Sequence, residues 1–180
     1  MNNFFKHLKT VSIHRRYVRR GCFKVGLYFQ GLTHDLSKYS PSEFWVGVKY
    51  YQGFQSPNNG ERQAIGYSTA WMHHKGRNKH HFEYWVDYSN KQGSAVTVPV
   101  PMPNKYIAEM VMDRIAASKV YKGKDYNDSC PLEYLNNGKA DKLIHEETLN
   151  KLEMLLTILS KSGEKECFRY IKEEFLKNER

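Results

Sequence analysis

The chain has 180 residues, a formal net charge of +9, 40% hydrophobic residues and 14% aromatic residues. This composition excludes a disordered or collagen-like protein and provides enough apolar side chains for a packed core. No aliphatic run approaches the roughly 20 residues that a membrane-spanning helix needs. We therefore expect a soluble protein that forms one domain over residues 1–180, without a membrane partner.

Two apolar stripes at helical spacing mark the start of the chain. The first predicts a helix over residues 4–20 that ends at Gly21. The second runs over residues 25–36 and predicts a helix that carries the adjacent pair His34 and Asp35.

A helix start is the clearest local signal in the sequence. Ser40, followed by a proline and by Glu43, matches a capping box, which predicts a third helix over about 41–51. Turn-forming residues predict a loop over 52–60, and the segment 61–74 then predicts a fourth helix.

The second half of the chain contains one segment that cannot be helical. Residues 89–103 include three prolines that lack an amide donor, so we expect either a long surface loop or a small hairpin. The other periodic segments predict helices over 104–121, 131–135, 146–160 and 164–177. About seven helices and no convincing strand elsewhere predict an all-α bundle.

The N-terminus and the cysteines bear on the compartment. Residues 1–10 lack the apolar stretch of a secretory signal. The three cysteines are widely spaced, without a C-x-x-C pair, which argues against a disulfide framework or a zinc-thiolate site. A cytoplasmic protein is expected. The positive charge favours anionic partners such as nucleotides, phosphate esters or nucleic acid, although it also serves ordinary solubility.

Side chains that ligate metals occur on three of the predicted helices. His14 is on the first, His34 and Asp35 are on the second, and Asp113 is on the helix over 104–121. Imidazole nitrogens and carboxylate oxygens suit divalent ions, and ligands on different helices can hold one ion inside a bundle. A histidine-dense segment over 73–81 could complete a second site.

This arrangement resembles the HD superfamily of metal-dependent phosphohydrolases. The resemblance rests on His14-x-x-x-Val18, on the segment Gly31–Lys38 that contains His34-Asp35, and on Asp113 in an apolar helix. It spans about residues 7–121, which would form the metal-site core, with C-terminal helices over 131–177 packed on it. The whole chain is also similar to an uncharacterised family of bacterial and phage proteins, which implies no reaction.

The HD resemblance implies a metal site and its ligands. His14, His34, Asp35 and Asp113 would bind one divalent ion (Mn, Co, Ni, Zn, Fe or Mg), and His74 with one of His80 or His81 could bind a second. The glutamate and the Gly-Tyr-Pro signature of the cyclic-dinucleotide phosphodiesterase branch are missing, because Lys75 follows His73-His74.

A phosphohydrolase would use the metal to activate water and polarise the phosphoryl group. Histidines can transfer protons near neutral pH, and cations can neutralise the phosphate in the transition state. The candidate catalytic residues are Lys38, His74, His80 and His81, and the candidate substrate-binding residues are Lys75, Arg77 and Lys79.

Each residue also has an ordinary structural interpretation. His14 could be a hydrogen-bonded core histidine, Asp113 could pair with Arg114, and the segment 73–81 could be a solvated basic loop. The four principal ligands taken together favour the metal site. The aromatic residues near the histidines could stack a nucleobase, although packing in the core is favoured for each; they are Tyr67, Trp71, Phe82, Tyr84, Trp85 and Tyr88.

These observations predict a metal-dependent phosphohydrolase that acts on a nucleotide or a related phosphate ester. One alternative is a di-iron oxygenase of the HD fold, and another is a basic nucleic-acid-binding protein without catalysis. A His-metal-finger nuclease is rejected, because the spacing within 73–81 leaves too little chain for its two strands and helix. The sequence fixes neither the substrate nor the oligomeric state.

Overall fold

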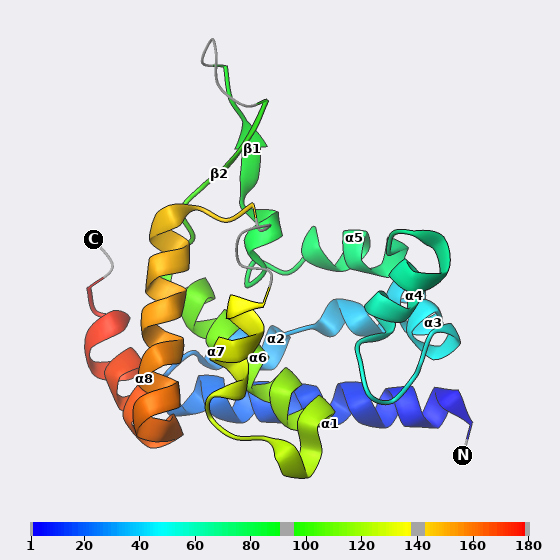
Figure 1. Ribbon diagram of the computed structural model, residues 1–180, viewed down its shortest axis with the longest axis horizontal. Helices are drawn as coiled ribbons and strands as arrows, with labels where there is room; N and C mark the ends of the chain where they lie inside the picture. Colours follow the sequence, from blue (N-terminus) through cyan, green and yellow to red (C-terminus); the bar gives the residue numbers. More distant parts are fainter. Residues whose placement is uncertain (1, 91–95, 138–142, 179–180) are drawn as a thin grey trace.

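The computed structural model describes residues 2–90, 96–137 and 143–178. Helix α1 (Asn3–Lys24) runs along the lower part of the molecule in the view of Figure 1, with the helices between residues 28 and 75 above it. Its buried face includes His7, Val11, His14 and Val18, at the spacing that one helix face requires.

Helix α1 is longer than predicted, because Gly21 lies inside it. The helix packs against α6 (Asn104–Lys122), and an added Cβ at Gly21 would lie 2.6 Å from Sδ of Met112. Glycine is therefore required for the close approach of the two helices and does not end α1.

The core lies where α6 meets α7 (Cys130–Asn136) and α8 (Glu146–Tyr170). These helices confirm the predicted periodic segments. Gly163 has non-helical backbone angles (φ 78°, ψ 172°), so α8 bends where the sequence predicted two helices, and a π-helical turn, Ile171–Phe175, follows it. The side chains with no exposed surface here include Ile107, Val111, Leu135, Leu152, Leu155, Leu156 and Leu159.

The proline-rich segment contributes to a small hairpin that projects from the helical body (Figure 1). Strand β1 (Val86–Tyr88) pairs antiparallel with β2 (Thr97–Pro99), with Val86 opposite Pro99. Of the two alternatives for residues 89–103 the structure contains the hairpin, although it begins earlier. Residues 91–95 of that segment lie outside the described residues.

The prediction of one helix over 25–36 is wrong. Helix α2 (Tyr28–Thr33) ends before His34, Asp35 has a positive φ of 54°, and a 3-10 turn, Leu36–Tyr39, follows. Aspartate is among the few residues that tolerate this left-handed conformation, and the break directs both polar side chains inward.

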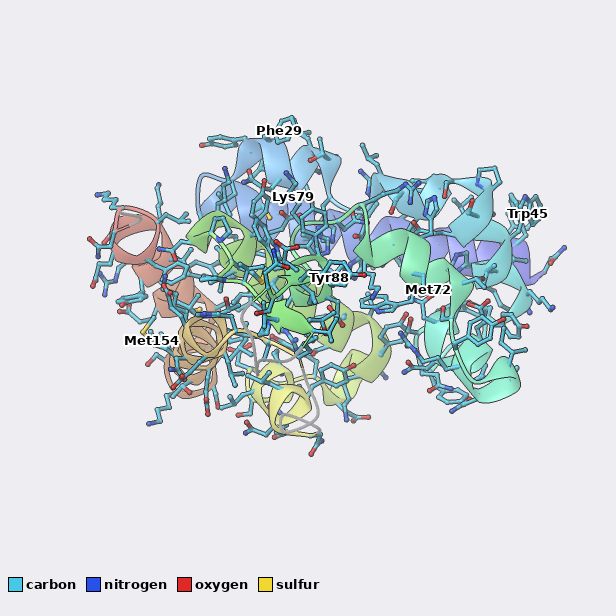
Figure 2. All side chains as sticks on the ribbon, turned by 90° about the horizontal axis from the view of Figure 1, so that it is seen from above. Phe29, Trp45, Met72, Lys79, Tyr88 and Met154 are labelled. Atoms are coloured by element: carbon cyan, nitrogen blue, oxygen red, sulfur yellow. The ribbon has the colours of Figure 1, made fainter. Side chains whose placement is uncertain are left out.

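Apart from Val25, which is buried, the apolar stripe of this segment faces solvent instead of the core. Its large side chains are between 51% and 74% exposed: Tyr28, Phe29, Leu32 and Leu36. Figure 2 shows Phe29 at the periphery, pointing away from the body, as does Trp45 of α3 (Pro41–Lys49).

The predicted helix over 61–74 is two helices, α4 (Pro57–Ile65) and α5 (Thr69–Lys75). Helix α4 begins inside the predicted loop. It ends at Gly66, whose φ of 86° favours glycine. Glu61 then accepts hydrogen bonds of 2.6 Å from the hydroxyls of Ser68 and Thr69, which orients the start of α5. Among the described residues, every helix is too short or too polar to cross a bilayer.

Candidate metal centre

Metal-ligating side chains from four parts of the chain meet in the core. They come from α1, from the break after α2, from α5 with the turn after it, and from α6. The residues are His14, His34, Asp35, His74, His80, His81, Glu109 and Asp113.

Asp35 lies between two groups of histidines. Its Oδ1 is 3.2 Å from Nε2 of His74 and 3.4 Å from Nε2 of His80. Its Oδ2 is 3.5 Å from Nε2 of His14 and 3.4 Å from Nε2 of His34. The carboxylate has no exposed surface. Its Oδ2 forms an ion pair of 2.7 Å with Nζ of Lys38, and neither oxygen makes a hydrogen bond of good geometry with the histidines. Each oxygen therefore faces a different set of ligands.

The first cluster consists of His14, His34, Asp35 and Asp113, whose ligand atoms all lie within 4.8 Å of one another. Oδ1 of Asp113 is 3.0 Å from Nε2 of His14 and 3.5 Å from Nε2 of His34. The structure thus brings together the four residues that the sequence singled out, across a separation of 99 positions between His14 and Asp113.

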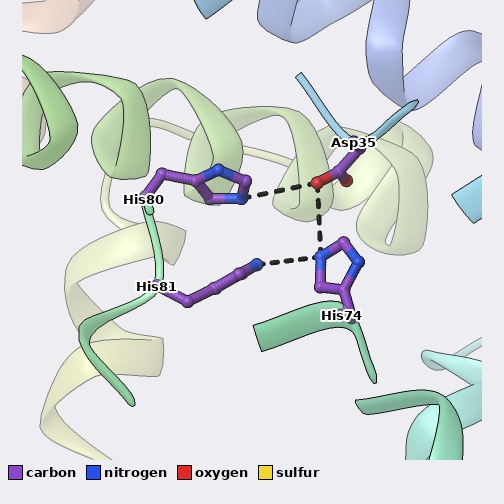
Figure 3. Close-up of side chains that lie close together, drawn as sticks. All are labelled: Asp35, His74, His80 and His81. Carbon is purple, nitrogen blue, oxygen red and sulfur yellow. Dashed lines mark hydrogen bonds and ion pairs between the residues drawn. The ribbon is translucent and has the colours of Figure 1, made fainter. Parts of the chain in front are cut away.

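The second cluster consists of Asp35, His74, His80 and His81 (Figure 3). Nε2 of His74 is 3.0 Å from Nε2 of His81 and also faces Oδ1 of Asp35. Both His80 and His81 take part, where the sequence suggested one of them. Asp35 belongs to both clusters, so two ions held here would share its carboxylate.

The atoms of both clusters are spaced as ligands of an ion would be. A zinc-sized ion binds imidazole nitrogen at about 2.0–2.1 Å, which leaves its ligand atoms roughly 3 Å apart. The nitrogens of His14 and His34 are 3.4 Å apart, and those of His74 and His81 are 3.0 Å apart. Such pairs need a proton or a cation between them, because two lone pairs repel each other. The donor set therefore fits divalent ions.

Glu109 supports one histidine of each cluster. Its Oε1 accepts hydrogen bonds from Nδ1 of His34 at 2.8 Å and from Nδ1 of His80 at 3.1 Å. A carboxylate at Nδ1 leaves Nε2 available to a metal and fixes the orientation of the ring. The sequence analysis missed Glu109. Its position one helical turn before Asp113, on the same face of α6, was the available signal.

Glu43 orients a histidine of the second cluster in the same way. The prediction that it forms a capping box with Ser40 is wrong. Its carboxylate accepts hydrogen bonds from Nδ1 of His74 at 2.8 Å and from Nδ1 of His73 at 2.6 Å. Ser40 precedes α3 but makes no side-chain cap, so the capping box does not form. Glu43 pairs with the histidines instead of capping the helix, because a buried imidazole without a hydrogen-bond partner destabilises the folded chain.

The charges of the site are strongly coupled. Burial raises the pKa of Asp35, but His34, Lys38 and His74 oppose it and hold the pKa well below its usual range. For His81, burial lowers the pKa well below the ordinary value, and the neighbouring His80 and His74 act in the same direction. Asp35 is thus an anion and His81 is neutral, which are the forms that bind metals. Burial lowers the pKa values of His34 and His74, but Asp35 outweighs burial and raises both, so a metal would displace protons from these two rings.

A cavity of about 510 Å³ adjoins the centre. Ligands of both clusters line it, namely His14, His74, His81 and Asp113. The volume lies within the range of small-molecule sites, so the centre is accessible to a ligand of that size.

The predicted cations differ in their position relative to this cavity. Lys38 lines it, with Nζ 2.7 Å from Oδ2 of Asp35. Lys75, Arg77 and Lys79, the candidate substrate-binding residues, are not among its lining residues. Arg77 donates to the His73 carbonyl at 3.3 Å, and Nζ of Lys79 lies 5.8 Å from the Tyr84 ring centre. The other cations that line the cavity are Arg62, Arg114 and Lys122.

The aromatic residues near the histidines separate into two groups. Trp71 and Phe82 line the cavity. Tyr67, Tyr84 and Tyr88 are exposed. Trp85 packs against the core beside Tyr106, as expected for a core side chain.

The model of a family of unknown function, DUF5662, matches residues 3–158. No curated protein and no solved structure matches the chain significantly.

Proposed function

The chain belongs to DUF5662, and we propose that it is a metal-dependent phosphohydrolase of the HD type that acts on a nucleotide or a related phosphate ester. One observation carries the proposal. Buried Asp35 presents each of its two carboxylate oxygens to a separate cluster of histidines, at distances between 3.2 and 3.5 Å. We propose that the centre holds two divalent ions with Asp35 between them.

The donor set narrows the choice of metal. Bound divalent ions would lower the pKa of a coordinated water and polarise a phosphoryl oxygen. Imidazoles outnumber carboxylates in both clusters taken together, which favours Fe, Co, Ni or Zn over Mg and Mn. The order of the ligands along the chain, from His14 through His34-Asp35 to Asp113, supports assignment to the HD superfamily.

Lys38 supplies a fixed positive charge beside the reaction centre. Burial lowers its pKa, but Asp35 and Asp113 oppose this and raise the pKa above its usual value, so the side chain remains an ammonium ion. An ammonium group within reach of the cavity would neutralise a phosphate and stabilise the charge that develops in the transition state. Its role is therefore electrostatic, and it does not act as a base.

The residues proposed as acid–base groups have a different role in this scheme. His74, His80 and His81 point Nε2 toward the second cluster, so they act as ligands. Their Nδ1 atoms are directed elsewhere: His74 bonds to Glu43 and His80 to Glu109.

The same donor set also suits two irons, which keeps an oxygenase as the second candidate. The two functions differ in their metal and in their substrate. Two irons, with a visible spectrum that changes on exposure to oxygen and with no phosphate release, would favour the oxygenase. Salt-dependent binding of nucleic acid by a metal-free protein would favour the third alternative, a basic binding protein.

Metal content is the primary test. Elemental mass spectrometry on the purified, metal-loaded protein should give about two equivalents per chain. Asp35→Asn should lose most of both, because its carboxylate serves both clusters. Asp113→Asn should lose mainly one. Asp125→Asn changes an exposed residue outside the site and serves as the matched control.

Activity is measured on the same preparations. Phosphate release from a panel of nucleotides and p-nitrophenyl phosphates should require metal, and it should be abolished in Asp35→Asn and retained in Asp125→Asn. Circular dichroism confirms that each variant is folded. A folded wild-type protein that takes up no metal, or that takes up metal and hydrolyses no phosphate ester, would contradict the proposal.

A further inference from the structure

Helix α2 and the end of α1 present an exposed apolar surface, which we call the α2 surface. It consists of Phe23, Tyr28, Phe29 and Leu32, whose exposed fractions lie between 39% and 74%. The rings of Phe23 and Tyr28 pack edge to face with their centres 5.3 Å apart, and Leu32 follows Tyr28 and Phe29 at the spacing of one helix face. Single exposed apolar side chains are ordinary, but a contiguous group marks a site of interaction.

The α2 surface projects from the molecule and is separate from the cavity. Figure 2 shows Phe29 at the periphery, pointing away from the helical body. None of the four side chains lines the cavity beside the metal centre. The proposed activity therefore does not explain why these side chains are exposed.

Basic residues adjoin the α2 surface. Three exposed arginines of α1 precede Phe23 by seven, four and three residues, which places them on the same helix face. They are Arg16, Arg19 and Arg20. A fourth, Arg15, donates a hydrogen bond of 3.2 Å to the carbonyl of Leu32. Residues 1–34 contain seven lysines and arginines and no acidic residue, and Asp35, which follows, is buried. Exposed apolar side chains and positive charge thus occur side by side.

The combination of the two properties selects the partner. A second copy of the chain docked through the same face would bring two groups of arginines together, and like charges repel. The phosphates of a nucleic acid would pair with the arginines, but a phosphate backbone has no apolar layer to cover the projecting side chains. An anionic bilayer provides both, because its negative headgroups lie above an apolar layer.

We propose that the α2 surface docks on a bilayer that contains anionic phospholipid. Tyr28, Phe29 and Leu32 enter the boundary between the headgroups and the acyl chains, and the arginines of α1 contact the headgroups. Docking of this kind lies in the plane of the interface and needs no membrane-spanning helix. The expectation of no membrane partner rested on the lack of a spanning segment, so it does not address this contact.

Co-sedimentation of the full chain with vesicles tests the proposal. One set of vesicles contains phosphatidylcholine alone, and the other contains phosphatidylcholine and phosphatidylserine. The protein should bind the mixed vesicles about tenfold more tightly or better, because each basic residue near an anionic surface contributes about fivefold. Binding should weaken as the salt concentration rises, because salt screens exposed charges.

Two double variants separate the apolar and the basic contributions. Phe29→Ser with Leu32→Ser should reduce the affinity for mixed vesicles about tenfold or more, since each buried CH₂ group contributes about fourfold. Arg19→Gln with Arg20→Gln should reduce it roughly 25-fold and should also reduce its dependence on salt.

Matched controls change similar side chains elsewhere on the molecule. Tyr88→Ser replaces an aromatic residue of β1 that is 75% exposed, and Lys161→Gln with Lys165→Gln removes two exposed cations of α8. Both control proteins should bind mixed vesicles as the wild type does. Circular dichroism confirms that each variant is folded.

Several outcomes would overturn the proposal, and none of them depends on metal content or phosphate release. They are equal binding of the wild type to both kinds of vesicle, binding to neither, and unchanged binding of the variant that lacks Phe29 and Leu32. If the wild type binds no vesicle but binds duplex DNA through Arg19 and Arg20, the surface is a nucleic-acid site. A dimer in sedimentation velocity that Phe29→Ser abolishes, without vesicle binding, would assign the surface to self-association.

Discussion

Nδ1 of His34 donates a hydrogen bond of 2.8 Å to Oε1 of Glu109 in the core of the bundle. The same oxygen lies 3.1 Å from Nδ1 of His80. His34 belongs to one candidate ligand cluster and His80 to the other, so a single carboxylate on α6 orients a ligand of each.

Glu109→Gln should weaken metal binding at both clusters. The amide keeps the size of the side chain but loses its charge and presents a donor group beside the two imidazoles. A lost carboxylate of this kind typically reduces metal affinity 10- to 100-fold. Competition with a chromogenic chelator measures the affinity, and Glu133→Gln on the exposed face of α7 is the control. Equal affinities of the variant and the wild type would refute the role of Glu109.

Glu43→Gln should affect one cluster only. Glu43 bonds to His74 of the second cluster and to His73, and it contacts no ligand of the first. We therefore expect the affinity for one equivalent of metal to fall 10- to 100-fold while the other equivalent binds as in the wild type. Titration followed by elemental analysis distinguishes the two. Equal weakening of both equivalents would mean that the clusters do not bind independently.

Metal removal should lower the melting temperature. An ion that binds only the folded chain stabilises it by about 2.7 kcal/mol at a concentration 100-fold above its dissociation constant. For a chain of this size that corresponds to roughly 5–10 °C. Differential scanning calorimetry with and without a chelator measures the shift. Asp35→Asn should melt at the same temperature in both conditions, and a chelator shift retained in this variant would place the stabilising ion elsewhere.

Stability should fall in acid because of His7. Burial, with the nearby charge of Lys38, lowers the pKa of this histidine from 6.5 to about 4. The unfolded chain therefore takes up a proton at a higher pH than the folded chain does. The contribution of neutral His7 to the free energy of unfolding is fully present above about pH 6.5. It decreases as the pH falls toward 4, by at most about 3 kcal/mol.

The variant His7→Leu isolates this effect from the other histidines. Urea unfolding of the metal-free protein at pH 7.5 and pH 4.5 gives a free-energy difference for each chain. That difference should be smaller in the variant, because leucine does not titrate. Identical pH dependence in the two proteins would show that His7 does not contribute.

Gly47→Ala should destabilise the contact between α1 and α3. An added Cβ would lie 2.2 Å from Nε2 of His7, which is itself packed in the interior. Overpacking of this kind costs about 1–3 kcal/mol. Gly76→Ala is the control, since its Cβ would meet nothing closer than 3.4 Å. Denaturant unfolding measures both, and the double variant with His7→Ala should recover part of the loss. If the double variant is no more stable than Gly47→Ala alone, the destabilisation does not come from the contact with His7.

The sequence by itself determined the helical class and singled out the four residues of the first cluster. The periodicity of α6 and α8 identified their buried faces, because helical spacing is a local property. His14, His34, Asp35 and Asp113 were recognisable from residue type and order, and the structure places them in one cluster.

Only the tertiary structure decided how these residues are used. The break at Asp35 replaces a helix that local spacing favoured, and it depends on the partners that the carboxylate meets in the core. Glu43 does not form the capping box that the sequence predicted, and instead accepts hydrogen bonds from two histidines that are 30 and 31 positions away. The cations of the cavity likewise come from other segments than the histidine-rich one. Spacing along the chain defines the face of a helix, but the contacts of a buried charge depend on which faces meet.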